Sequence, residues 1–135
     1  MLSGTVEKRV RYAETDKMGF LYYGNYAQLY EIGRVELIRD IGITYQVMED
    51  EHKIMMPVLE LQCRYRLPAK YDDLLTIKTE IRDKPTKMIQ FFHEICNQDE
   101  VLLHTGSVKL LFIDMKTNKR ISCPSFLTEK MDKFF

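Results

Sequence analysis

The sequence predicts an α+β domain in which an antiparallel sheet of about five strands wraps around one long central helix. Apolar residues between 26 and 41 recur at spacings of three and four, as they do along one side of a helix. From Val58 onward the period changes to two, which is typical of strands that bury one face. At this length a chain usually forms one unit, so we expect residues 1–135 to be a single domain.

The first elements are a short strand and the long helix. Residues 5–12 alternate apolar or long side chains with charged ones, as in a half-buried strand. Asn25 and Gln28 form an N-x-x-Q version of the capping box at the start of the helix, and Gly42 is suited to the left-handed backbone at its end. The apolar stripe of this helix consists of Tyr26, Leu29, Tyr30, Gly33, Leu37 and Ile41. Each large side chain contributes about 1.5–3 kcal/mol when it is buried, so the stripe must face a core.

The opposite side of the long helix mixes charged and apolar side chains. Two pairs of opposite charges three residues apart give a solvated pattern: Glu31 with Arg34, and Glu36 with Arg39. Ile32 and Val35 lie among them. They are either scattered exposed apolar residues or part of a face that a second subunit covers. Thr44, after this helix, is expected to cap a second and shorter one.

Four strands are expected in the second half of the chain. Alternation marks them at residues 59–65, 75–81, 89–95 and 101–114. The short polar turns between them favour an antiparallel meander. Gly106, in the middle of the last strand, is typical of a bulge or a sharp curl. Pro124 is expected to open a C-terminal helix that ends near Met131.

Composition argues against several classes of function. Lys plus Arg equals Asp plus Glu at twenty each, so no net field draws the chain to nucleic acid or to an anionic membrane. No apolar run approaches the ~18 residues of a membrane span, and the N-terminus lacks the apolar segment of a signal peptide. The cysteines, Cys63, Cys96 and Cys123, are widely separated, which indicates reduced thiols in the cytoplasm.

Most motifs of cofactor and hydrolase chemistry are missing from the sequence. It contains no G-x-S-x-G, no Walker A loop and no G-x-G-x-x-G after a strand. His52, His93 and His104 lack the local spacing of helical zinc sites, although the fold could still bring them together. We therefore expect neither a metal nor a cofactor.

Asp16 is the candidate for chemistry. It lies in a loop with Gly19 and Gly24, just before the amino end of the long helix. Such a helix end presents unpaired amides and a partial charge of roughly half a unit, which can polarise a carbonyl and hold an oxyanion. A nearby carboxylate can activate water or attack the carbonyl itself. The alternative is that Asp16 is a turn residue, which is the more frequent role of aspartate in such loops.

The run ETDKMGFLYYGNYAQLYE, residues 14–31, resembles the signature of the hotdog-fold acyl-CoA thioesterases of the 4-hydroxybenzoyl-CoA thioesterase type. The likeness is strongest to their YbgC-like branch, and Pro68 to Asp73 is similar to a hairpin of the same family. The resemblance covers nearly the whole chain. It implies a hotdog fold, in agreement with the sheet and helix expected above, and hydrolysis of an acyl-CoA to a carboxylic acid and free coenzyme A.

The resemblance also implies roles for residues around the loop. Asp16 becomes the catalytic carboxylate, and the backbone amide of Tyr23, next to Gly24, binds the thioester carbonyl. Many YbgC-like members carry histidine at the position of Tyr23, so a step that needs an imidazole is in doubt here, whereas an amide donor survives the change. Glu31 matches a position that can face the far end of the acyl group, and its alternative is an ion pair with Arg34.

Further expectations concern the rest of the substrate and the assembly. Lys84 and Lys87 fall where the family's hairpin approaches the phosphates of coenzyme A, although a charged hairpin is usually only solvated. The family builds its site between two subunits, which implies a homodimer or homotetramer, and an acyl carrier protein is a further partner to consider. Two other functions stay open: a hotdog hydratase or dehydratase, which needs a histidine beside an acid, and a binding module for acyl-CoA or acyl carrier protein with little turnover.

Overall fold

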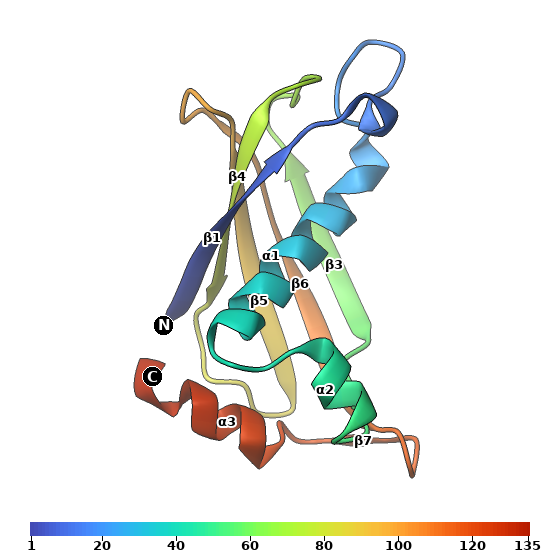
Figure 1. The fold of residues 1–135 in the computed structure, drawn as a ribbon, viewed down its shortest axis with the longest axis vertical. Helices are drawn as coiled ribbons and strands as arrows, with labels where there is room; N and C mark the ends of the chain where they lie inside the picture. Colours follow the sequence, from blue (N-terminus) through green and yellow to red (C-terminus); the bar gives the residue numbers. More distant parts are fainter.

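The computed structural model describes residues 1–135 and contains one antiparallel sheet curled around a long helix, α1 (Tyr26–Asp40) (Figure 1). The long strands run across the sheet in the order β1 (Leu2–Arg9), β4 (Leu74–Ile81), β5 (Met88–Cys96), β6 (Leu102–Asp114) and β3 (Val58–Tyr65). Two short strands also pair with β6, namely β2 (Ile54–Met55) and β7 (Lys119–Ile121). The α+β class with about five principal strands is confirmed.

Three α-helices and three short 3-10 turns complete the chain. The α-helices are α1 (Tyr26–Asp40), α2 (Tyr45–Asp50) and α3 (Ser125–Met131). The 3-10 turns are η1 (Tyr12–Glu14), η2 (Tyr23–Asn25) and η3 (Asp132–Phe134). Thr44 caps α2 as predicted, because its hydroxyl accepts from the amide of Val47. None of the helices combines the length and the apolar character needed to cross a membrane.

The buried stripe of α1 matches the prediction except at its end. The buried residues are Tyr26, Leu29, Tyr30, Gly33, Leu37 and Ile38. Ile38 takes the place expected for Ile41, which follows the last helical residue and is only partly buried. Gly42 then turns the chain with φ +94°, in the left-handed region that favours glycine.

The capping box predicted at Asn25 is wrong. Asn25 has helical backbone angles, φ −86° and ψ −7°, and its side chain accepts no capping hydrogen bond. The 3-10 turn η2 leads directly into α1, so Asn25 lacks the extended backbone that an N-cap residue needs. Its side-chain amide instead donates to the carbonyl oxygen of Glu14 at 2.9 Å.

The predicted four-strand meander is also wrong in one connection. β4, β5 and β6 follow one another as a meander, but β3 pairs with β6 and lies at the far edge from β4. The connection over residues 66–73 therefore crosses the end of the sheet, beside the loop that contains Asp16. Segments that the sequence separates by some fifty residues thus meet at the amino end of α1.

β3 also differs from the sequence prediction in its burial. Its alternation predicts one buried face, yet all eight of its residues are exposed. The reason is its position at the far edge of the sheet, because α1 packs mainly over β1, β4 and β5 and touches β3 through Tyr26 and Tyr30 without covering it. β3 therefore presents an apolar face, which includes Leu59 and Leu61, and an unpaired edge.

Gly106 does not mark a bulge. The sheet stays in register there, and the irregularities lie between Val58 and Glu60 and between Ile95 and Cys96. A Cβ at Gly106 would lie 1.6 Å from the hydroxyl oxygen of Tyr30. The glycine is therefore needed for the close approach of Tyr30 to β6.

A polar cluster lies in the core between α1 and the sheet. The Tyr30 hydroxyl hydrogen-bonds Nε2 of His104, and Thr79 hydrogen-bonds Nδ1 of His93 at 3.0 Å. The ring of Tyr30 stacks on His93 with centroids 4.4 Å apart. Burial lowers the pKa of His93 to about 3 and that of His104 to about 4, so both are neutral near pH 7. The fold brings two of the three histidines together in this cluster, and no group of three metal-ligating side chains occurs in the chain.

Candidate active site

Asp16 has one oxygen fixed by its own loop and one oxygen without a partner in the chain. Its Oδ1 accepts hydrogen bonds from the amides of Met18, at 2.9 Å, and Phe20, at 3.2 Å. Gly19 turns the loop with φ +81°, and its amide donates to the carbonyl of Asp16 at 3.0 Å. Asp16 is thus a turn residue, which was the alternative to a catalytic role in the sequence analysis. The same turn leaves its Oδ2 free to accept a proton.

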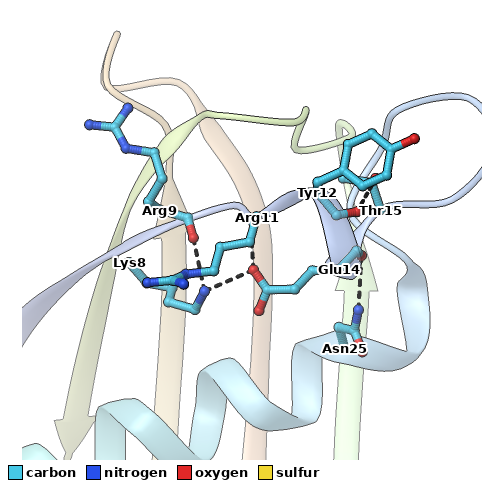
Figure 2. Close-up of polar contacts among 7 residues, drawn as sticks. All are labelled: Lys8, Arg9, Arg11, Tyr12, Glu14, Thr15 and Asn25. Carbon is cyan, nitrogen blue, oxygen red and sulfur yellow. Dashed lines mark hydrogen bonds and ion pairs between the residues drawn. The ribbon is translucent and has the colours of Figure 1, made fainter.

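The two ends of this loop are held together at one carbonyl group. The carbonyl oxygen of Glu14 accepts from the amide of Tyr22 and from the side chain of Asn25, both at 2.9 Å. Figure 2 shows the Glu14 carboxylate beside Lys8, with which it pairs at 2.8 Å, and it also accepts from the amide of Arg11. Burial acts to raise the pKa of Glu14, but the hydrogen bonds from Lys8 and Arg11 outweigh it and lower this pKa. Glu14 therefore stays charged, its carboxylate ties η1 to β1, and its backbone carbonyl ties η1 to the start of α1.

The connection between β3 and β4 supports the outer side of the loop. The amide of Leu21 donates to the carbonyl of Ala69, and the amide of Tyr71 donates to that of Gly19, both at 2.8 Å. A bridge also pairs Phe20 with Lys70. The backbone around Asp16 is therefore held by η1, by the start of α1 and by this connection.

Asp16 lies on the wall of an apolar pocket of about 340 Å³. The loop, the start of α1 and the end of β3 with the connection after it supply the other lining residues: Phe20, Leu21, Tyr23, Tyr26, Tyr65, Arg66, Leu67 and Pro68. Six of the nine lining residues are hydrophobic, so the pocket suits an apolar group placed next to a carboxylate.

The first turn before α1 reaches the same pocket through Tyr23, whereas Gly24 is not among the residues that line it. The first hydrogen bond inside η2 runs from the amide of Asn25 to the carbonyl of Tyr22, so the amides of Tyr23 and Gly24 precede the first bonded donor. The hydroxyl of Tyr65 donates to the carbonyl of Tyr23 at 3.0 Å, which fixes the plane of the following peptide group. Tyr23 and Asp16, both predicted from sequence, are therefore brought together.

The other residues singled out by the sequence lie away from this pocket. Glu31 is exposed on α1 and forms no ion pair with Arg34. Lys84 and Lys87 follow β4, whose eight residues span about 25 Å, whereas the Asp16 loop adjoins its beginning. Lys84 pairs with Asp132, which directly follows α3, and Figure 1 shows α3 at the opposite end of the sheet from the loop. Within one chain these lysines are remote from Asp16.

Sequence reasoning missed the wall formed by Tyr65, Leu67 and Pro68. It also missed a second cavity, of about 510 Å³, that shares Asp16 with the first. Both depend on the crossing of residues 66–73 over the end of the sheet, which a meander does not contain. The stretch from Pro68 to Asp73 was the one signal in the sequence that pointed to this region.

The curled sheet around one helix, with a carboxylate and helix-end amides at an apolar pocket, defines a hotdog-type domain with a site suited to attack on a carbonyl. Residues 10–131 match the family described as the thioesterase-like superfamily. Because this match spans nearly the whole chain, the protein belongs to the thioesterase-like superfamily.

Relatives and solved structures agree with this assignment. The chain is 30% identical over 122 residues to the acyl-CoA thioester hydrolase YbgC of Escherichia coli, and the alignment covers 90% of each protein. It is 40% identical over 77 residues to YneP of Bacillus subtilis, a segment that spans 57% of this chain and 55% of that relative's length. The structure of a DHNA-CoA thioesterase from Staphylococcus aureus, at 33% identity, superposes with a TM-score of 0.85 over 100% of this chain and 85% of the other. The predicted hotdog fold and the YbgC-like resemblance are confirmed.

Proposed function

We propose that the protein hydrolyses an acyl-CoA thioester to a carboxylic acid and free coenzyme A. The observation that carries the proposal is the position of Asp16 on an apolar pocket that also contains the turn before α1. The similarity to the YbgC thioester hydrolase and to the DHNA-CoA thioesterase supports the same substrate class.

In the proposed mechanism the acyl group occupies the apolar pocket, and the thioester carbonyl oxygen accepts from the amides of Tyr23 and Gly24. These amides stabilise the negative charge that develops on that oxygen. Oδ2 of Asp16 removes a proton from water, and the water oxygen bonds to the carbonyl carbon. Alternatively, Oδ2 attacks the carbon and water then hydrolyses the mixed anhydride. In both routes the C–S bond breaks, the thiolate of coenzyme A takes up a proton, and water is the only co-substrate.

We further propose that the active form is a homodimer or a homotetramer. β3 has no partner on its outer edge, and Val58, Leu59, Leu61 and Tyr65 on it are each 43–52% exposed. A long apolar edge strand is normally covered in a native protein. Because Tyr65 also lines the Asp16 pocket, a subunit that pairs with β3 would become a further wall of that pocket.

The partner subunit gives the remaining expected residues their proposed roles. Glu31 would face the far end of an acyl group, and Lys84 with Lys87 would contact the phosphates of coenzyme A bound to the other subunit. Replacing both lysines with alanine is then expected to raise KM for acyl-CoA but not for acyl-pantetheine, which has no phosphate.

An acyl carrier protein is a second source of the same thioester. The three free cysteines support a cytoplasmic location.

A thiol-release assay across short, long and aromatic acyl-CoAs tests the proposed reaction. The expected result is acid and free thiol in equal amounts from at least one substrate. Tight binding of acyl-CoA without thiol release would instead indicate a binding module. Enoyl-CoA or 3-hydroxyacyl-CoA provides the other control, because its conversion with the thioester intact would indicate a hydratase or dehydratase.

A further inference from the structure

Tyr65, at the end of β3, connects the edge of the sheet to the turn before α1. Its hydroxyl donates to the carbonyl oxygen of Tyr23 at 3.0 Å, although 42 residues separate the two in sequence. The rings of the two tyrosines lie edge-on, with centroids 6.5 Å apart and an angle of 78° between them. Tyr65 also lines the apolar pocket that contains Asp16. One side chain therefore forms a wall of the pocket and a hydrogen bond to the backbone beside it.

This hydrogen bond acts on the backbone that carries the proposed amide donors. The carbonyl of Tyr23 and the amide of Gly24 belong to one planar peptide group, so neither can turn without the other. Both amides proposed as donors precede the first bonded donor of the η2 turn, so the turn itself does not fix them. Burial raises the pKa of Tyr65 to about 12, so its hydroxyl keeps the proton that it donates.

The ring of Tyr65 is held from the side of the core. The rings of Tyr26 and His104 meet it edge-on, with centroids 5.1 Å and 4.8 Å away. His104 is buried, stacks on Tyr26 with centroids 4.1 Å apart, and is hydrogen-bonded through Nε2 to the hydroxyl of Tyr30. These contacts continue from the core cluster to the pocket. The Tyr65 hydroxyl is therefore directed at the carbonyl of Tyr23 although half of the residue is exposed.

We propose that Tyr65 is a positioning residue for the hydrolysis, and the assignment rests on the proposed function. Through the carbonyl of Tyr23, its hydroxyl holds the amides of Tyr23 and Gly24 in the orientation in which they donate to the thioester oxygen. The bond exists before the substrate binds, so these donors need no reorganisation when negative charge develops on that oxygen. Its effect therefore falls on the transition state rather than on substrate binding.

Tyr65→Phe tests the assignment because it removes the hydroxyl and keeps the ring. Loss of one direct oxyanion donor lowers kcat by roughly 10²–10³-fold. Loss of a group that only orients the donors should cost less, so this variant is expected to lower kcat for acyl-CoA about tenfold, or ~1.4 kcal/mol. Its Kd for the same acyl-CoA is expected to stay within about twofold of the parent value, or ~0.4 kcal/mol.

Two further variants separate positioning from other roles of the side chain. Tyr65→Ala also removes a wall of the pocket, so it is expected to lower kcat by a similar factor and to raise Kd as well. Tyr12→Phe is the matched control, because Tyr12 loses the same hydroxyl but is 81% exposed and lies outside the apolar pocket. It is expected to keep the parent kcat and Kd.

Vibrational spectroscopy of bound substrate gives a readout that a merely structural role would not change. Hydrogen bonds to the thioester oxygen polarise the carbonyl and lower its stretching frequency. The measurement uses acyl-CoA with an isotope-labelled carbonyl, bound to Asp16→Asn so that turnover is slow. Adding Tyr65→Phe is expected to move the carbonyl band back toward the frequency of free acyl-CoA, whereas adding Tyr12→Phe should leave the band in place.

The outcomes distinguish this assignment from the proposed function. A Tyr65→Phe variant with the parent kcat, or with an unchanged carbonyl band, would overturn the positioning role and leave the hydrolysis intact. A loss of thermal stability with neither change would make the hydrogen bond purely structural and overturn the role as well. A parent protein that hydrolyses no acyl-CoA would refute the proposed function, and the assignment with it.

Discussion

Lowering the pH from 7 to 5 is expected to destabilise the fold through the two histidines under α1. His93 is 2% exposed and His104 is 0% exposed, and burial lowers their pKa values to about 3 and about 4. In the unfolded chain both titrate near pH 6.5. Because the folded pKa values are the lower ones, the unfolded chain binds more protons. The stabilisation is therefore complete above pH 6.5 and is lost as the pH falls toward 4.

The size of this destabilisation follows from how far the pH falls below 6.5. Each histidine that stays neutral in the folded chain loses about 1.4 kcal/mol of stabilisation for every pH unit below 6.5. Between pH 6.5 and 5 the two histidines together lose about 4 kcal/mol. A domain of this kind has about 5–15 kcal/mol of total stability, so the loss is a large fraction of it. The carboxylates with lowered pKa, Glu14 and Glu80, lose their stabilisation only as the pH falls below about 4.5, outside this range.

Urea unfolding followed by circular dichroism at several pH values between 7 and 5 measures this loss. The unfolding midpoint is expected to fall steadily over this range. His52→Gln is the control, since His52 stacks on Phe126 outside the core cluster, and this variant should keep the pH dependence of the parent. An unfolding free energy that is the same at pH 7 and pH 5 would refute the reasoning.

Three further predictions concern the packing, the loop and the assembly. Gly106→Ala is expected to destabilise the fold by about 1–3 kcal/mol or more, because its Cβ would overlap the Tyr30 hydroxyl; an unchanged thermal midpoint would contradict this. Asn25→Ala removes the hydrogen bond across the base of the loop and is expected to lower kcat about tenfold, whereas the exposed Gln28→Ala should keep the parent kcat. Leu61→Lys places a charge on the open edge of β3 and is expected to yield monomers in analytical ultracentrifugation, and an oligomer of parent size would exclude that edge as the interface.

Local patterns were sufficient to predict most of the elements. The helix from Tyr26 and the strands after Leu74 follow from side-chain periodicity, because each buries one face against the same core. The Asp16 loop was also recognisable from a local pattern, because its glycine, its carboxylate and the following helix are neighbours in sequence. The structure brings Asp16 and Tyr23 to one pocket, as the motif implied.

What could not be predicted depends on contacts between distant residues. β3 has the alternation of a strand with one buried face, but periodicity does not reveal which strand is its neighbour or whether a helix reaches it. Asn25 resembles a cap, and only the position of Glu14, eleven residues earlier, shows that its side chain has another partner. Gly106 could mark a bulge or a close contact, and the second depends on the Tyr30 hydroxyl from another element.

The central claim is that the free oxygen of Asp16 acts on a thioester carbonyl held at the amino end of α1. Asp16→Asn keeps an acceptor for the amides of Met18 and Phe20, so the loop is expected to persist while the basic oxygen is lost. The most direct measurement is kcat for acyl-CoA hydrolysis by this variant, alongside its equilibrium binding of the same acyl-CoA. We predict a fall in kcat on the order of 10²-fold or more with binding retained. A variant that turns over at the parent rate would contradict the claim.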